Sequence, residues 1–274
     1  MQFVHQTGVS LKTLWNEFAH EHATIPVLAK RYKINEKTVR RKLDAYELPV
    51  IAPQPRTMVA VMDATKVGYS WILAVRDPAQ GETVYAHEVS HESTSAYQMA
   101  HTELSMSGFV FSGIVTDGRF VDVDWLFPGI PLQMCHFHQL QIVIRYLTLN
   151  PKLVAGIELL DLVRTLPTTD EASFTDAFNL WLRTYHDFLN EKTIDPETGR
   201  AQWTHKRLRQ ARDSVKNHLP ILFTYLKYPE LNMPNTTNSL DGAFKKGKMA
   251  IGIHAGLTHV RQMKLMLSLL FARE

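Results

Sequence analysis

Three aspartates stand in segments that a fold could bring to one site. Asp63 follows the apolar run Val-Ala-Val-Met, Asp117 follows Ile-Val-Thr, and Asp241 lies in Asn-Thr-Thr-Asn-Ser-Leu-Asp-Gly. Between the second and third aspartate, Cys135 and His138 form a Cys-x-x-His pair. Magnesium prefers carboxylate oxygens and keeps water ligands that substrate phosphates can replace. The pattern therefore predicts a metal-dependent enzyme that acts on phosphodiesters.

The composition is that of a globular protein with a sizeable core. The chain has 274 residues, of which 45% are hydrophobic, and this length predicts one large domain or two modest ones. A single cysteine excludes an intramolecular disulfide and a four-cysteine zinc site. The start of the sequence lacks a signal-peptide pattern, and no apolar stretch approaches the roughly 20 residues that span a bilayer. We therefore expect a cytoplasmic protein.

Positive charge is concentrated in two stretches, although the net charge is only +3. Residues 200–216 carry six Lys or Arg against one acidic residue, and residues 241–274 carry six against two. Such clusters are typical of surfaces that contact phosphates, although a solvated helix face gives the same pattern. The candidate DNA contacts in these stretches are Arg207, Arg212, Lys245, Lys246 and Lys248.

Residues 1–48 show the pattern of a helix-turn-helix DNA-binding domain. Pro26 stands where a helix begins, residues 33–35 break it, and a second helix follows Asn35. The second helix of such a motif enters the major groove of DNA. The alternative is a small helical hairpin packed against the rest of the chain. The candidate DNA contacts are Lys37, Thr38, Arg40, Arg41 and Lys42.

A proline-rich linker at 49–56 precedes a segment in which strands alternate with helices. For residues 57–138 the periodicity predicts strands at 57–62, 69–75, 83–89, 109–115 and 131–134, and helices at 93–106 and 122–126. Three antiparallel strands followed by this alternation are typical of a ribonuclease H-like fold. In that topology the first and fourth strands are neighbours, so Asp63 and Asp117 would lie side by side.

The remainder of the chain reads as helical. The pattern of residues 139–232 predicts an all-α insertion domain. The pattern of residues 233–274 predicts the final helices of the core, which carry the third acidic residue and a glycine-rich gap at 247–256. The predicted fold class is therefore α/β, with a ribonuclease H-like mixed sheet interrupted by an all-α insertion and preceded by a small all-α helix-turn-helix domain.

The ordered set of Asp63, Asp117, Cys135-x-x-His138 and Thr-Thr-Asn-x-Leu-Asp-Gly resembles the mutator-type (MULE-related) bacterial insertion-sequence transposases of the DDE class. The resemblance covers about residues 57–270. It implies that Asp63, Asp117 and Asp241 are the catalytic metal triad, with Cys135 and His138 as a signature pair beside the fifth strand. It also implies that the insertion contacts the transposon ends. The third acid of the family is usually Glu, whereas this chain has Asp241.

The resemblance implies a DNA transposase that uses two Mg²⁺ (or Mn²⁺) ions. Phosphodiester hydrolysis at the transposon ends would be followed by strand transfer of the freed 3′-hydroxyl into target DNA. The expected partners are double-stranded DNA, as terminal inverted repeats and target, and further copies of the chain in a homodimer or larger assembly on the bacterial chromosome, with no membrane. Two alternatives remain: a catalytically degenerate transposase-derived DNA-binding protein, and a ribonuclease H-like nuclease.

Several residues keep two interpretations. Cys135 and His138 could order the floor of the active site or contact a flanking nucleotide, and a buried thiol that only packs in the core is the alternative. Arg119 could clamp a phosphate or form an ordinary surface ion pair. Trp203 could stack on an unpaired base or belong to the core.

Overall fold

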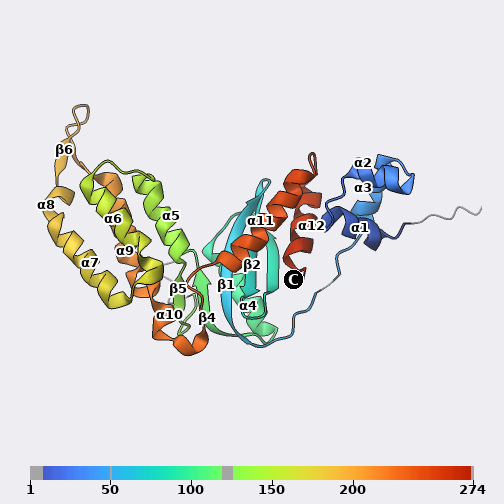
Figure 1. Cartoon of the computed structure of the whole chain (residues 1–274), viewed down its shortest axis with the longest axis horizontal. Helices are drawn as coiled ribbons and strands as arrows, with labels where there is room; N and C mark the ends of the chain where they lie inside the picture. The colour runs from blue at the N-terminus through green and yellow to red at the C-terminus, as the bar shows by residue number, and fades with distance from the viewer. Residues whose placement is uncertain (1–8, 50, 119–125, 273–274) are drawn as a thin grey trace, which may run out of the picture. The chain divides into compact units, whose positions relative to one another are not determined.

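The computed structural model describes residues 9–49, 51–118 and 126–272. The chain divides into two compact units, and Figure 1 shows the elements of each. Unit 1 comprises Met1–Pro55, Ala64–Leu104 and Asn238–Glu274, and unit 2 comprises Arg56–Asp63 and Ser105–Thr237. Strand β1 (Thr57–Val67) contributes residues to both units.

The fold is mixed α/β, with a five-stranded mixed sheet in the order β3-β2-β1-β4-β5. Its other strands are β2 (Ser70–Asp77), β3 (Glu82–Val89), β4 (Val110–Thr116) and β5 (Leu132–Met134). The β2–β3 pair is antiparallel, whereas β1–β4 and β4–β5 are parallel. The predicted proximity of the first and fourth strands is confirmed by the register, which places Val61 opposite Val115.

In unit 1, two helices begin at residues that the sequence indicated, Pro26 and Asn35. The Ser10 hydroxyl caps α1 by accepting from the Thr13 N–H at 2.9 Å, and the Asn35 side chain caps α3 through the Thr38 N–H at 2.8 Å. Pro26 occupies the first turn of α2. The helices of this unit are α1 (Leu11–Ala19), α2 (Ile25–Tyr32), α3 (Glu36–Ala45), α4 (Thr94–Met106), α11 (Asn238–Ile253) and α12 (His259–Leu270).

The N-terminal helices share one hydrophobic core with the C-terminal helices. Leu14, Trp15 and Phe18 of α1 are buried in the same cluster as Ala250 of α11 and Leu265 of α12. The Trp15 indole N–H donates to the Ser268 hydroxyl at 2.9 Å, across 253 residues of sequence. The three-helix segment therefore packs against the end of the chain within unit 1.

Unit 2 contains a helical block with its own core, formed mainly by apolar faces of α5, α6, α7 and α9. Phe174, Phe178 and Trp181 line one side of this core, and the Trp181 indole donates to the Ala155 carbonyl at 3.0 Å. Its helices are α5 (His136–Leu147), α6 (Val154–Arg164), α7 (Glu171–Thr184), α8 (His186–Leu189), α9 (Lys206–Leu222) and α10 (Thr224–Lys227), with short 3-10 turns at Leu166–Thr168 and Pro229–Leu231.

The prediction that residues 139–232 are entirely helical is wrong. A hairpin of β6 (Lys192–Ile194) and β7 (Ala201–Trp203) interrupts the helices, and Asp195 orders its turn by accepting from the Glu197 N–H at 2.9 Å. Each strand has only three residues, all of them exposed, which is too short for an alternation of apolar and polar residues to reveal a strand.

The predicted glycine-rich gap at 247–256 is also wrong, because α11 continues to Ile253. Gly247 is buried, and a Cβ there would overlap the Met266 sulfur, so this glycine allows α11 and α12 to approach closely rather than ending a helix. Most of the predicted helix at 122–126 lies outside the described residues. Among the helices that the structure describes, none combines the length and hydropathy needed to cross a bilayer.

Candidate metal centre

Asp63 and Asp117 are brought together by the parallel pairing of β1 and β4. Each lies two residues beyond the last matched pair, Val61 and Val115, so both extend past the shared ladder by the same length. Their side chains are almost fully buried, with 6% and 7% exposure. Burying carboxylates is unfavourable unless their charge is compensated, and sites of this kind are often functional.

The sequence predicted that the strand ends just before Asp63, but the structure does not have a strand end there. Strand β1 continues through Asp63 to Val67, whereas β4 ends at Thr116. The strand continues because β1 also has β2 as a neighbour on its other side. Asp63 therefore projects from regular strand backbone, whereas Asp117 belongs to the loop that follows β4.

Cys135 and His138 lie beside this pair at the start of α5. The Cys135 N–H donates to the Thr116 carbonyl at 2.8 Å, which continues the β4–β5 ladder, and the residue then caps α5. Its fully buried sulfur accepts from the Thr237 N–H at 3.3 Å and lies 3.5 Å from the Thr237 hydroxyl. That hydroxyl is 3.4 Å from Nδ1 of His138. The signature pair thus fixes Thr237, the residue immediately before α11.

The two members of the pair influence each other's protonation. Burial alone lowers the pKa of His138, but hydrogen bonding to Cys135 and the negative charges of Cys135, Asp63 and Asp117 outweigh it and raise that pKa to about 9. Burial raises the pKa of the Cys135 thiol, but hydrogen bonds from His138 and Thr237 reverse the effect and leave it lowered. A protonated His138 has no lone pair for a metal, so in that state the ring acts as a cation beside the carboxylates.

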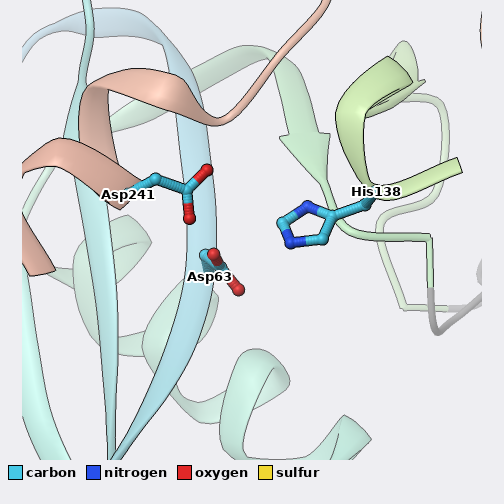
Figure 2. Close-up of side chains that lie close together, drawn as sticks. All are labelled: Asp63, His138 and Asp241. Carbon is cyan, nitrogen blue, oxygen red and sulfur yellow. The ribbon is translucent and has the colours of Figure 1, made fainter. Parts of the chain in front are cut away.

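The side chains that could bind a metal ion form two groups, and Asp63 belongs to both. One ligand atom from each of Asp63, His138 and Asp241 lies within 4.8 Å of the others, and Figure 2 shows these side chains pointing toward one another. In the second group, one ligand atom from each of Asp63, Glu92 and Asp117 likewise lies within 4.8 Å of the others. Among the described residues, all three predicted aspartates therefore belong to these groups, although Asp117 and Asp241 do not share one.

Glu92 was missed by the sequence analysis. It lies between β3 and α4, and its Oε1 accepts from the Tyr97 hydroxyl at 2.9 Å. An acidic residue shortly after a predicted strand was the available signal, but such residues are common in turns and helix caps, so the position did not stand out.

The predicted DNA contacts of α3 lie on its more accessible side. Lys37, Arg40 and Arg41 are exposed, and Thr38 is half-buried. Arg40 is paired with Glu36 at 2.8 Å. Lys42 is different, because its ammonium donates to the Val9 carbonyl at 3.3 Å and so contributes to the packing of this segment.

The basic residues of the later segments differ in availability. Arg207 is exposed but donates to the Arg145 carbonyl at 2.8 Å, and Arg212 is mostly buried in an ion pair with Asp213 at 2.6 Å. Trp203 is 40% exposed and has Arg209 over its ring at 3.7 Å, so it is not a core residue. Arg119 lies outside the described residues. On α11, Lys245, Lys246 and Lys248 are all exposed.

A cavity of about 400 Å³ lies beside the loop that carries Asp117. Gly118, His218, Arg145, Asp213 and Asn217 are among the residues that line it.

Comparisons with known proteins add no assignment. The sequence matches no protein-family model, and no curated protein matches it.

Proposed function

We propose that this chain is a DNA transposase of the DDE class with a ribonuclease H-like catalytic core. The observation that carries the proposal is the burial of Asp63 and Asp117 at equivalent positions beyond a parallel strand pair. Two buried carboxylates held this close are suited to a divalent cation, which would compensate their charge. The sheet order, with β1 beside β4, supports the ribonuclease H-like assignment.

The donor atoms fit Mg²⁺ or Mn²⁺. The group of Asp63, Glu92 and Asp117 offers only carboxylate oxygens, which are the ligands that these hard cations prefer. Asp63 belongs to both groups, so Asp63, Asp117 and Asp241 are the residues that would hold the ions. When bound, the ions would supply Lewis-acid chemistry, which lowers the pKa of a coordinated water or 3′-hydroxyl and neutralises charge on the leaving oxygen.

The protein's own residues would orient the reacting groups. The carboxylates of Asp63 and Asp117 come from backbone held by the sheet and the adjoining loop, so they need little reorganisation to act. Thr237, fixed by the sulfur of Cys135, sets the start of the helix that carries Asp241. The cavity beside Gly118, with the Arg145 side chain in its lining, would receive a phosphate of the DNA strand.

The shorter third acid does not by itself indicate a degenerate enzyme. The Asp241 carboxylate lies within 4.8 Å of ligand atoms of Asp63 and His138, so the aspartate side chain is long enough to join the group. This geometry supports catalysis over the alternative of a DNA-binding protein that has lost its chemistry.

DNA binding would involve both helical regions. The exposed Lys37, Arg40 and Arg41 of α3 would contact the terminal inverted repeats, as in helix-turn-helix proteins. The exposed Arg207 of α9 and the exposed lysines of α11 would contact DNA phosphates, with at least two copies of the chain holding paired ends on the bacterial chromosome.

The proposal is tested with the purified protein and a duplex that carries the DNA flanking its coding region. We expect nicking that requires Mg²⁺ or Mn²⁺ and stops in EDTA, followed by joining of the freed 3′-hydroxyl to a second duplex. Asp117→Asn should reduce nicking to background while end binding, measured by mobility shift, is retained. Asp161→Asn is the matched control, because Asp161 is exposed and forms an ion pair with the nearby Arg164 at 2.8 Å. Normal nicking by Asp117→Asn would contradict the proposal.

A further inference from the structure

His218 connects helix α9 to the loop that carries Asp117. The side chain is buried, and its Nε2 lies 2.9 Å from the main-chain oxygen of Gly118. A carbonyl oxygen can only accept, so Nε2 carries a proton and donates it to this bond. On the other side of the ring, Nδ1 lies 2.6 Å from Oε1 of the fully buried Gln139, whose Nε2 donates to the Ser214 hydroxyl at 2.9 Å.

The ring is suited to donate a single proton. Burial lowers the pKa of His218, and this effect outweighs the opposing influence of the Gly118 carbonyl and the charge of Asp117. A neutral ring with its proton on Nε2 has a lone pair on Nδ1, and a half-turn of the Gln139 amide allows it to donate to that lone pair. The hydrogen bond from Nε2 to the Gly118 carbonyl is therefore the same in either orientation of the Gln139 amide.

Gly118 is closely packed. Gly118 has φ of +78°, and a Cβ at this position would overlap the Met134 sulfur and lie 3.2 Å from Nε2 of His218. Both the backbone conformation and the close packing therefore require glycine. The same contacts press the loop against the end of β5 and against α9.

The residues on both sides of Asp117 have anchored carbonyl groups. The Thr116 oxygen accepts from the Cys135 N–H at 2.8 Å, and the Gly118 oxygen accepts from His218 at 2.9 Å. The two anchors belong to different elements, the start of α5 and the last third of α9. Because an aspartate has only two side-chain torsions, fixing its backbone on both sides strongly limits where its carboxylate can point.

We propose that His218 is a positioning residue, whose hydrogen bond to Gly118 holds the Asp117 carboxylate in the direction required for binding a divalent ion. The inference rests on the proposed function, since it assumes that Asp117 is a metal ligand. Residues that support metal ligands in this way typically contribute 10- to 100-fold to metal affinity.

The test compares Mn²⁺ affinity in folded variants, measured by electron paramagnetic resonance of the free ion. His218→Leu removes the donor, and we expect its Kd for Mn²⁺ to rise about 10- to 100-fold. His218→Gln keeps an N–H at a similar reach and should restore most of the affinity. His254→Leu is the matched control, because His254 is also buried and its Nε2 lies 2.9 Å from the Phe18 carbonyl, in a different core. It should lower the melting temperature but leave the Kd unchanged.

The outcomes separate this inference from the proposed function. If the wild-type protein and Asp117→Asn bind Mn²⁺ equally, the proposed function fails. If Asp117→Asn loses binding but His218→Leu retains wild-type affinity, only the positioning role is overturned. Should His218→Leu not fold, Mn²⁺ affinity is measured in His218→Asn instead. The asparagine amide can occupy the position of Nδ1 near Gln139, but it is too short to donate to the Gly118 carbonyl. Unchanged Mn²⁺ affinity in that variant would equally overturn the positioning role.

Discussion

The two helical regions of this protein build their cores in different ways. The core of the block from α5 to α10 draws on one continuous stretch, from Met134 to Phe223. The core around α1–α3 instead recruits Ala250, Leu257 and Leu265 from the other end of the chain. One region closes its core with neighbouring sequence, whereas the other depends on partners more than 200 residues away, as the Trp15–Ser268 hydrogen bond illustrates.

The difference follows from helix length and surface. Helices α1, α2 and α3 have 9, 8 and 10 residues, too few to be stable without tertiary contacts. Their apolar faces are covered in part by α11 and α12, while Lys37, Arg40 and Arg41 remain accessible. Packing against the rest of the chain, which the sequence offered as an alternative to DNA binding, is therefore compatible with it.

The largest expected effects come from replacing one buried phenylalanine in each core with alanine. Phe18 and Phe178 are both at most 1% exposed, so either change to Ala should lower the free energy of unfolding by about 3–5 kcal/mol. Hydrogen exchange distinguishes the cores: Phe18→Ala should increase exchange in α12 as well as α1, and Phe178→Ala only within residues 136–228. Unchanged exchange in α12 for Phe18→Ala would show that the N-terminal core is self-sufficient.

A smaller effect is expected from two glycines inside helices. Gly247→Ala would press a methyl group against the buried Met266 and should destabilise the protein by about 1–3 kcal/mol, despite the better helix propensity of alanine. Gly156→Ala in α6 meets its nearest neighbour, Pro151 Cβ, at 3.3 Å, which is tight but not overlapping, and should be close to neutral. Urea unfolding of both variants measures the difference, and equal losses would contradict the close approach of α11 and α12.

The smallest effect is expected from the ion pair between Asp44 and Arg261, which joins α3 to α12. Its shorter contact is 2.6 Å, but the Asp44 side chain is 52% exposed, so after allowance for solvent screening Arg261→Gln should cost less than about 1 kcal/mol. The more exposed pair of Arg164 and Asp161 provides the control, since Arg164→Gln should cost still less.

The same ion pair gives a pH dependence with a defined sign. Hydrogen bonding from Arg261 lowers the pKa of Asp44 below its ordinary value of 3.8, against the opposing effect of burial. The pair therefore stabilises the fold above that ordinary value and loses its contribution as the pH falls through the lowered pKa. The stability difference between the wild type and Arg261→Gln should be present at neutral pH and vanish in acid. A difference that grew on acidification would refute this assignment.

Much of the fold was readable from local sequence because burial patterns and caps are local. The apolar runs before Asp63 and Asp117 indicated strands β1 and β4, and Asn35 indicated the start of α3. The hairpin of β6 and β7 escaped detection because each strand has only three residues, too few for a pattern of alternation to be recognised. Gly247 was misread because close helix contact and helix termination both favour glycine.

By itself the sequence determined which acidic residues follow or lie within buried strands and therefore where a metal centre could form. Only the tertiary structure decided that Asp63 is shared by two groups, that Glu92 joins one of them, and that His218 anchors the loop of Asp117. These relations depend on side chains whose neighbours are distant in sequence. Periodicity reports which face of an element is buried, but it carries no information about which other element covers that face.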